Sequence, residues 1–324
     1  MPLMSHTLIV PFAATGDTPD SAGLSGLQLP QLQALLGLLH TDLALGGDPY
    51  SASTPHELAQ AQALGLLSDA SAQDGLLPWA ALANGSLHTP CAWVWPCHFQ
   101  VGMEQVNLLP PERLSIDDTT SRALHAALAP LCAEDGVELR WVSAERWLAV
   151  GDRLAGLRCA SLDRVVGRSL DVWQPRAEPA HQAQLAWLQR LQSEAQMLFY
   201  THPANDAREA QRLPSLNGVW FSGVGALPAL PTATAPQLDD TLRQAALHGG
   251  RSAWQAAWAA LDAGPLAELL QRQRAGEPLT LWLCGERWAR RWVSAPAATG
   301  WAQRLRRSLG LQPKASVADI LGSL

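Results

Sequence analysis

Three short runs of mainly apolar residues predict buried strands. They lie at residues 7–14, 218–222 and 279–284, and each has the length of a strand rather than of a helix. Strands of a parallel sheet are covered on both faces, so their sequences are hydrophobic throughout instead of alternating. Because segments with helical periodicity separate these runs, the pattern predicts an α/β fold with a mostly parallel sheet flanked by helices.

The helices between the runs are predicted from apolar residues at helical spacing and from capping signals. Thr54 and Glu57 match the two ends of a capping box, with a proline in the first turn between them. Capping therefore explains Glu57 better than catalysis does. A second helix start offers three capping residues, Asp117, Asp118 and Thr119. The predicted helices cover residues 29–40, 55–67, 75–86, 115–132, 181–199, 239–247, 252–274 and 301–309.

A different pattern fills the region from residue 89 to residue 175. A strand run at 91–95 precedes an alternation of apolar and polar residues, and residues 138–142 and 146–150 have the pattern of an antiparallel pair. Together with the helix between them, these strands predict an inserted α+β subdomain. We therefore expect a core domain of residues 1–88 and 176–324 and an inserted subdomain of residues 89–175, with boundaries accurate to about 15 residues.

Composition and charge argue against several functional classes. A net charge of -6 leaves no overall basic face for nucleic acid, and the arginines at 287–291 and 304–307 alternate with Trp or Leu at helical spacing, as on a solvated face. No run of about 18 apolar residues predicts a membrane span, and no basic leader precedes the first apolar run. Five scattered cysteines without metal-binding spacing are typical of reduced thiols, so we expect a cytoplasmic protein. A single lysine, Lys314, among many arginines is typical of a GC-rich bacterial gene.

Tryptophan is the most unusual feature of the composition, with fourteen residues against four Phe and two Tyr. Each tryptophan buries a large area and usually needs a partner for its indole N–H, so a tryptophan-rich core is the first interpretation. A stacking surface for carbohydrate or nucleotide is the second. A third hypothesis is a docking surface for a protein partner, formed by an exposed apolar patch near Trp288, Trp292 and Trp301.

The densest set of chemically specific residues lies between residues 198 and 231. His202-Pro203 is followed by Asn205, Asp206 and Arg208, and a strand then leads into a Gly-x-Gly turn. This segment resembles archaeal-type cofactor-independent phosphoglycerate mutases, which belong to the alkaline phosphatase superfamily. Residues 29–35 are also similar to a helix start found across that superfamily. Over most of its length the chain resembles a proteobacterial family labelled phosphoglycerate mutase or RpfE-type regulatory protein, with hallmarks at residues 54–57, 96–98, 161–168 and 200–206.

The resemblance implies an alkaline-phosphatase-like fold and a family chemistry in which two divalent metals and a Ser or Thr nucleophile transfer phosphoryl groups. In that family an Asp follows the first strand, and an Asp-His pair follows a late strand. Here Pro11 follows the first strand, and Cys284 and Gly285 end the last one. The sequence thus lacks the Asp and the Asp-His pair that would be expected to bind the two metals. We predict a degenerate, mutase-like protein with a ligand-binding or regulatory role, no metal or other cofactor, and no two-metal phosphoryl transfer.

The expected ligand of such a protein is a phosphorylated or anionic small molecule, and a protein partner is the alternative. Arg164 and Arg168 offer guanidinium groups to an anion, although ion pairs with Asp163 and Asp171 explain these arginines somewhat better. The predicted ligand-binding residues are Arg164, Arg168, Asn205, Arg208, Gly223 and Gly225.

An active phosphomutase or phosphohydrolase with a rearranged site is the enzymatic alternative, and it would need Mn or Mg. This hypothesis requires its residues to converge in one cleft, although a lone histidine such as His98 is more typical of a hydrogen-bonded core residue. The nucleophile would be Ser51, Ser53 or Thr54. The catalytic and metal-binding candidates are His56, His98, Glu104, His202 and Asp206, with Asp48 as a further member.

Overall fold

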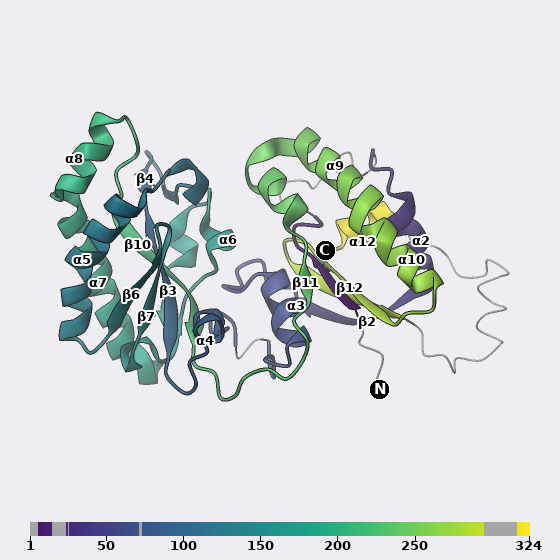
Figure 1. The fold of residues 1–324 in the computed structure, drawn as a ribbon, viewed down its shortest axis with the longest axis horizontal. Helices are drawn as coiled ribbons and strands as arrows, with labels where there is room; N and C mark the ends of the chain where they lie inside the picture. Colours follow the sequence, from purple (N-terminus) through teal and green to yellow (C-terminus); the bar gives the residue numbers. More distant parts are fainter. Residues whose placement is uncertain (1–5, 15–23, 25, 71–72, 295–315) are drawn as a thin grey trace. The chain divides into compact units, whose positions relative to one another are not determined.

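The chain folds into two compact units, shown in the computed structural model of Figure 1, which describes residues 6–14, 24, 26–70, 73–294 and 316–324. The first unit comprises Met1–Pro49, Pro55–Ser68 and Ala233–Leu324, and the second comprises Tyr50–Thr54 and Asp69–Thr232. Each unit combines a sheet with helices and has its own hydrophobic core. The predicted mixture of helices and strands is confirmed.

The first unit is built on a mixed five-stranded sheet with the strand order β11-β1-β12-β13-β2. Strand β1 (His6–Val10) runs parallel to both of its neighbours, β11 (Gln237–Leu238) and β12 (Leu279–Cys284). β13 (Trp288–Ser294) and β2 (Leu39–Gly46) continue the sheet in antiparallel fashion. The two buried runs at the ends of the sequence are therefore adjacent, while half of the sheet is antiparallel.

Helices cover both faces of this sheet. On one face, α2 (Pro30–Leu38), α9 (Gly250–Leu261) and α10 (Ala267–Arg274) pack against alternate residues of β1 and β12, such as Leu8 and Leu281. On the other face, Ala59 of α3 (Pro55–Ala63) packs against Ile9 and Trp282. α12 (Val317–Gly322) adds Leu321 to the first of these cores.

The buried carboxylate of Asp262 joins two elements of the first unit that are far apart in sequence. It follows α9 and accepts the main-chain N–H of Gln31 at 3.2 Å and of Leu32 at 2.8 Å. These N–H groups lie in the first turn of α2, where a helix has no internal acceptors. Asp262 therefore caps α2 from across the unit, because Leu29, the residue before that helix, makes no side-chain capping bond.

The second unit contains an antiparallel four-stranded sheet with the strand order β10-β3-β7-β6. Its strands are β10 (Gly218–Gly225), β3 (Cys91–Cys97), β7 (Arg146–Val150) and β6 (Glu138–Ser143). The predicted antiparallel pairing of the last two is confirmed. One face packs against α5 (Asp118–Glu134) and α7 (Gln182–Tyr200), which match two predicted helices closely.

The other face of this sheet is covered by shorter elements. They are α4 (Trp79–Asn84), α6 (Leu162–Val165), and the hairpin of β4 (Phe99–Val101) and β5 (Val106–Leu108). α8 (Pro203–Ala210) follows α7, and β8 (Leu157–Arg158) pairs with β9 (Arg176–Ala177). None of the helices in the described ranges is long and apolar enough to cross a bilayer.

The strand at 218–222 is where the predicted sheet differs most from the structure. It was expected beside the parallel strands, but β10 pairs antiparallel with β3 in the second unit. Its residues are hydrophobic because helices cover one of its faces and the segments around α6 cover the other. A hydrophobic run indicates that a strand is buried on both faces, but it does not indicate which strands pair with it. As a result, residues 176–232 group with the sheet of β3 and β7, whereas the predicted domains placed them with the core domain.

The structure corrects other elements and leaves one untested. β2 and β13 lie where no strand was predicted, and the arginines at 287–291, expected on a helical face, flank or lie on β13. The predicted exposed patch also differs, because Trp292 is 5% exposed in the first core and Trp288 is half-buried. Trp301, the arginines at 304–307 and the predicted helix at 301–309 lie outside the described residues.

Candidate functional site

The carboxyl ends of the parallel strands β1 and β12 are the usual place for a ligand site in an α/β sheet. In this protein the turn after β12 packs against Ala14 and Leu324. The N–H of Ala13 donates to the carbonyl oxygen of Cys284 at 2.8 Å, which joins the two strand ends. A methyl group added to Gly285 would lie 2.6 Å from the Cβ of Leu324. Leu324 is itself buried and accepts the main-chain N–H of Arg287 through its carbonyl oxygen.

The residues at this edge do not fit the two divalent metals that the resemblance implies. Mg²⁺ and Mn²⁺ prefer oxygen ligands, whereas β12 ends in the buried thiol of Cys284. In the described ranges, no three His, Cys, Asp or Glu side chains gather closely enough to hold a metal ion.

The candidates of the enzymatic alternative are divided between the two units. His56 lies on α3 of the first unit, where its ring is 5.5 Å from that of Phe12. Asp48 is an exposed residue of the same unit. The other candidates belong to the second unit, in which Glu104 is exposed beyond β4 and Asp206 is exposed on α8.

The two histidines of the second unit are each held by main-chain groups. His202 precedes α8, and its Nδ1 accepts the N–H of Ala204 at 3.1 Å, which makes His202 the cap of that helix. His98 follows β3, and its Nδ1 lies 2.7 Å from the carbonyl oxygen of Ser215. The His202 contact is a local helix cap, whereas the His98 contact joins two segments that are 117 residues apart in sequence.

The serine candidates also have structural partners, centred on Asp74. The Asp74 carboxylate accepts the hydroxyl of Ser51 at 2.6 Å and the main-chain N–H groups of Ala52 and Ser53 at 3.0 and 2.8 Å. The hydroxyl oxygen of Ser53 accepts the N–H of Gly75 at 2.9 Å. This network ties the short segment Tyr50–Thr54 to the rest of the second unit.

Arg208 is 1% exposed, and its guanidinium group is surrounded by main-chain carbonyl oxygens. Nε donates to Pro214 at 2.8 Å, Nη1 donates to Ser115 at 3.4 Å, and Nη2 donates to Leu114 in a short bond. Desolvation lowers the pKa of Arg208, while the negative charge of Asp117 opposes this effect. Arg208 therefore braces two backbone segments, and little of its side chain faces solvent.

Asn205, one turn before Arg208 on α8, also braces the return segment, residues 214–216 between α8 and β10. Its Nδ2 donates to the carbonyl oxygens of Phe199 and Leu216 at 2.7 and 2.8 Å, and its Oδ1 accepts the N–H of Leu216 at 2.8 Å. His98, Arg208 and Asn205 thus contact three consecutive residues, 214–216. The structure brings these sequence-predicted residues together around a backbone segment that leads directly into β10.

The two glycines of the predicted turn serve a β-bulge in β10. The register with β3 shifts between Ser222 and Gly225, and Gly223 has a φ of 60°, which side-chain-bearing residues rarely adopt. A methyl group on Gly223 would lie 3.1 Å from the Cβ of Trp79, and one on Gly225 would lie 2.9 Å from the carbonyl oxygen of Leu76. Gly223 therefore permits the close approach of α4, and Gly225 permits that of the segment just before it.

The predicted arginine pair lies beside this framework. Arg164 is 2% exposed, donates through Nη2 to the carbonyl oxygen of Ser53 at 3.3 Å, and lies 5.8 Å from the ring centroid of Trp173. Arg168 is half-buried after α6. The burial and contacts of Arg164 favour a structural role over the exposed anion clamp considered from the sequence.

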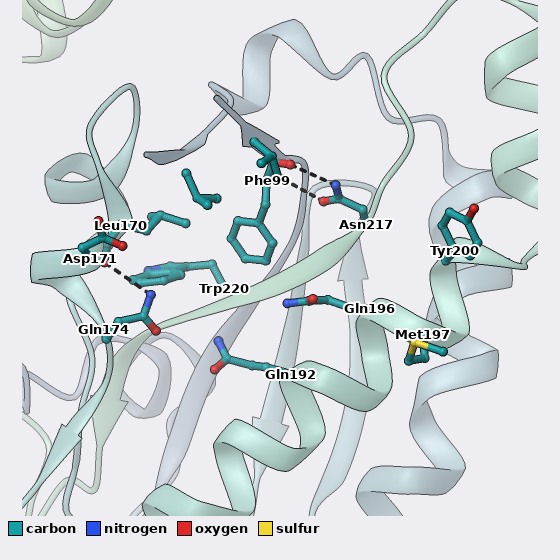
Figure 2. Close-up of a pocket in the computed structure, with 12 residues that line it drawn as sticks. Phe99, Leu170, Asp171, Gln174, Gln192, Gln196, Met197, Tyr200, Asn217 and Trp220 are labelled. Carbon is teal, nitrogen blue, oxygen red and sulfur yellow. Dashed lines mark hydrogen bonds between the residues drawn. The ribbon is translucent and has the colours of Figure 1, made fainter. Parts of the chain in front are cut away.

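A pocket of about 510 Å³ lies within the second unit, between the β4–β5 hairpin, the segment after α6, α7 and the start of β10 (Figure 2). Its volume falls in the usual range for small-molecule sites. Apolar side chains from all four segments contribute: Phe99, Val101, Val106, Leu170, Met197 and Trp220. The polar lining residues are Asp171, Gln174, Gln192, Gln196, Tyr200 and Asn217.

Several of the polar side chains are held in place by backbone contacts. Asn217 bonds both main-chain groups of Phe99, accepting its N–H at 2.7 Å and donating to its carbonyl oxygen at 3.0 Å. Gln174 donates to the carbonyl oxygen of Leu170 and Gln192 donates to that of Val219, each at 3.3 Å. Figure 2 shows Gln192 and Gln196 reaching from α7 toward Phe99 and Trp220. The pocket therefore has an oriented set of carboxamides beside aromatic rings.

None of the four carboxamides of the pocket was singled out from the sequence, because amides carry no motif of their own. One signal was present: Gln192, Gln196 and Tyr200 follow each other at four-residue intervals and therefore share one face of the predicted helix. The predicted motif is connected to the pocket indirectly. Asn205, Arg208 and His98 hold the segment that ends at Asn217.

No protein-family model matches the sequence, and no curated protein matches it. Among solved structures, the fold is similar to a cofactor-independent phosphoglycerate mutase from Thermoplasma acidophilum, with 13% identity, a TM-score of 0.41 and coverage of 99% of each chain. It is also similar to the PH0037 protein from Pyrococcus horikoshii, with 11% identity, a TM-score of 0.45 and coverage of 92% of this chain and 89% of the other. At these TM-scores the similarities carry no argument about the family or the activity of this chain.

Proposed function

We propose that the protein binds a small molecule in the pocket of its second unit and does not transfer phosphoryl groups through two metals. The observation that carries this proposal is the pocket itself. It combines a volume typical of small-molecule sites with aromatic walls and carboxamides that are already oriented by the backbone. Preorganised polar groups in a largely apolar cavity are what a binding site needs to select a ligand.

The second part of the proposal is supported by what occupies the ends of the parallel strands. Leu324, Ala14 and the buried thiol of Cys284 lie at the strand ends where the family chemistry would place metal ligands. The motif residues that resemble the mutases support backbone segments through Asn205 and Arg208. A retained scaffold with a ligand-binding or regulatory role accounts for both observations.

Ligand-observed NMR with a fragment library tests the first part. Gln196→Trp places a large side chain in the pocket, and Gln189→Trp is the matched control because Gln189 is exposed on the same helix and does not line the pocket. We expect some fragments to bind the wild-type protein and the control but not the blocked variant. If every fragment that binds also binds the blocked variant equally, the pocket is not the binding site.

Two measurements with metals test the second part. We expect Mn²⁺ and Mg²⁺ to leave the unfolding temperature unchanged, because a ligand that binds only the folded state would raise it. We also expect no interconversion of 3-phosphoglycerate and 2-phosphoglycerate in the presence of either ion. Metal-dependent mutase activity that disappears on substitution of His98 or His202 would instead establish the rearranged enzyme.

A further inference from the structure

We infer that the pocket takes an uncharged ring compound bearing hydroxyl or amide groups, such as a sugar or a nucleoside, and selects against its phosphorylated form. This inference rests on the proposed function, since it specifies the ligand of the same pocket. It also differs from the anionic ligand expected from the sequence. Three properties of the lining support it.

The first property is charge. None of the lining residues, all of which belong to the described part of the chain, is a Lys, Arg or His, and Asp171 contributes a carboxylate. A phosphate group would gain no cation in exchange for any water that it loses on contact with this lining, and it would face the like charge of Asp171, which is itself exposed. An uncharged ligand avoids both costs.

The second property is the kind of hydrogen bonding that the pocket offers. A carboxamide can donate and accept at the same time, and the pocket has four of them. Gln174 and Gln192 are each oriented by one donated bond, which leaves an oxygen and a second N–H on each side chain. Hydroxyl and amide groups of a ligand match such paired donors and acceptors, whereas a purely apolar ligand would leave them unpaired.

The third property is the shape of the apolar wall. The rings of Phe99 and Trp220 lie beside Leu170, and the indole N–H of Trp220 is bonded to the carbonyl oxygen of Ala160 at 3.0 Å. Because this bond fixes the indole, the part of the ring that reaches the pocket presents an apolar surface. Trp220 is 1% exposed and lies at the base of the pocket, so the C–H face of a sugar or the plane of a base would pack on the half-buried ring of Phe99 while its edge reaches the carboxamides of α7.

Matched pairs of ligands test the inference most sharply. The pairs are glucose with glucose 6-phosphate and adenosine with AMP, so each pair differs by one phosphate and the two pairs separate a sugar from a nucleoside. Binding to the full chain is measured by saturation-transfer NMR and calorimetry. We expect the neutral member of at least one pair to bind at least about tenfold more tightly than its phosphorylated partner, corresponding to about 1.4 kcal/mol.

Three variants locate the effect in the pocket. Gln196→Leu removes one carboxamide and should weaken the neutral ligand about fivefold, whereas Gln189→Leu should leave it unchanged. Asp171→Asn removes the lining charge and should strengthen the phosphorylated partner by about threefold without changing the neutral one. This last result separates electrostatic selection from a loss of folding, because binding improves.

The outcomes distinguish this inference from the proposed function. If a phosphorylated member binds more tightly and Gln196→Trp abolishes its binding, the ligand class is wrong but the pocket is a binding site. If a neutral member binds but is insensitive to both Gln196 variants, the site lies elsewhere and the proposed function fails with the inference. Binding by neither member of either pair overturns the ligand class.

Discussion

The strongest prediction concerns Arg208, because a ligand-binding arginine and a bracing arginine respond differently to truncation. Arg208→Ala removes one bond at 2.8 Å to Pro214, a short bond to Leu114 and a weaker contact at 3.4 Å to Ser115. Hydrogen bonds from a charged donor contribute about 1.5–3 kcal/mol each, and recovered desolvation of the cation offsets part of that sum. We expect a loss of about 3–5 kcal/mol, since the variant also leaves buried carbonyl oxygens unpaired.

Pulsed thiol labelling with mass spectrometry measures this loss within the second unit. Cys97 and Cys132 are buried there, and Cys284 reports on the first unit. At 3 kcal/mol, labelling of the first two cysteines should accelerate by about 150-fold. Arg190→Ala, which breaks an exposed ion pair with Asp135, is the control and should cost at most about 1 kcal/mol. A change at Arg208 no larger than that of the control would refute the bracing role.

Three further predictions test local features of the fold. Asp262→Ala should destabilise the first unit by about 1–3 kcal/mol in urea unfolding, because two N–H groups of α2 lose their buried acceptor. Asp117→Ala should cost about 1 kcal/mol at pH 7 by loss of the α5 cap. Hydrogen bonds from the N–H and the hydroxyl of Thr120 lower the pKa of Asp117 in the folded state. The stabilisation from the cap is therefore complete above the unfolded-state pKa of about 3.9, and it is lost as the pH falls through the lower folded-state pKa. The difference in stability between variant and wild type should vanish in strong acid. Burial raises the pKa of Cys132 and Cys159 to about 12 each, so an aromatic disulfide reagent should label no thiol rapidly in the native protein and all five in denaturant: Cys91, Cys97, Cys132, Cys159 and Cys284.

Local patterns in the sequence predicted local structure well. α5 and α7 begin and end within about three residues of the predicted positions, and the pair of β6 and β7 lies where alternation placed it. These elements are specified by caps and by periodicity, which act over a few residues. The parallel neighbours β1 and β12 were also predicted, because both are buried on both faces.

The partner of β10 was not predictable in the same way. Its apolar run reports burial on two faces, but the antiparallel register with β3 depends on side-chain packing between segments more than 100 residues apart. For Asn205 and Arg208, the sequence motif marked both residues as candidates for ligand binding. Whether they bind a ligand or brace the backbone depends on how deeply their side chains are buried. Only the structure shows that their polar atoms point at carbonyl oxygens of the return segment.

The pocket is a property of tertiary arrangement, which explains why the sequence did not indicate it. Its lining comes from segments between residues 99 and 220, and its amides lack the spacing rules of metal ligands or nucleophiles. The even spacing of Gln192, Gln196 and Tyr200 is consistent with an exposed helix face as well as with a pocket wall. Only the hairpin and the segment after α6 turn that face into a cavity.

Methionine methyl NMR provides the most direct test of the central claim. The chain has four methionines, and Met197 lines the pocket at its open side with 71% exposure. Its signal is assigned by Met197→Leu. Titration with the tightest neutral ligand of the matched pairs should shift this methyl signal saturably, and Gln196→Trp should abolish the shift. Saturable binding that leaves the Met197 methyl unperturbed would contradict the assignment of the pocket as the binding site.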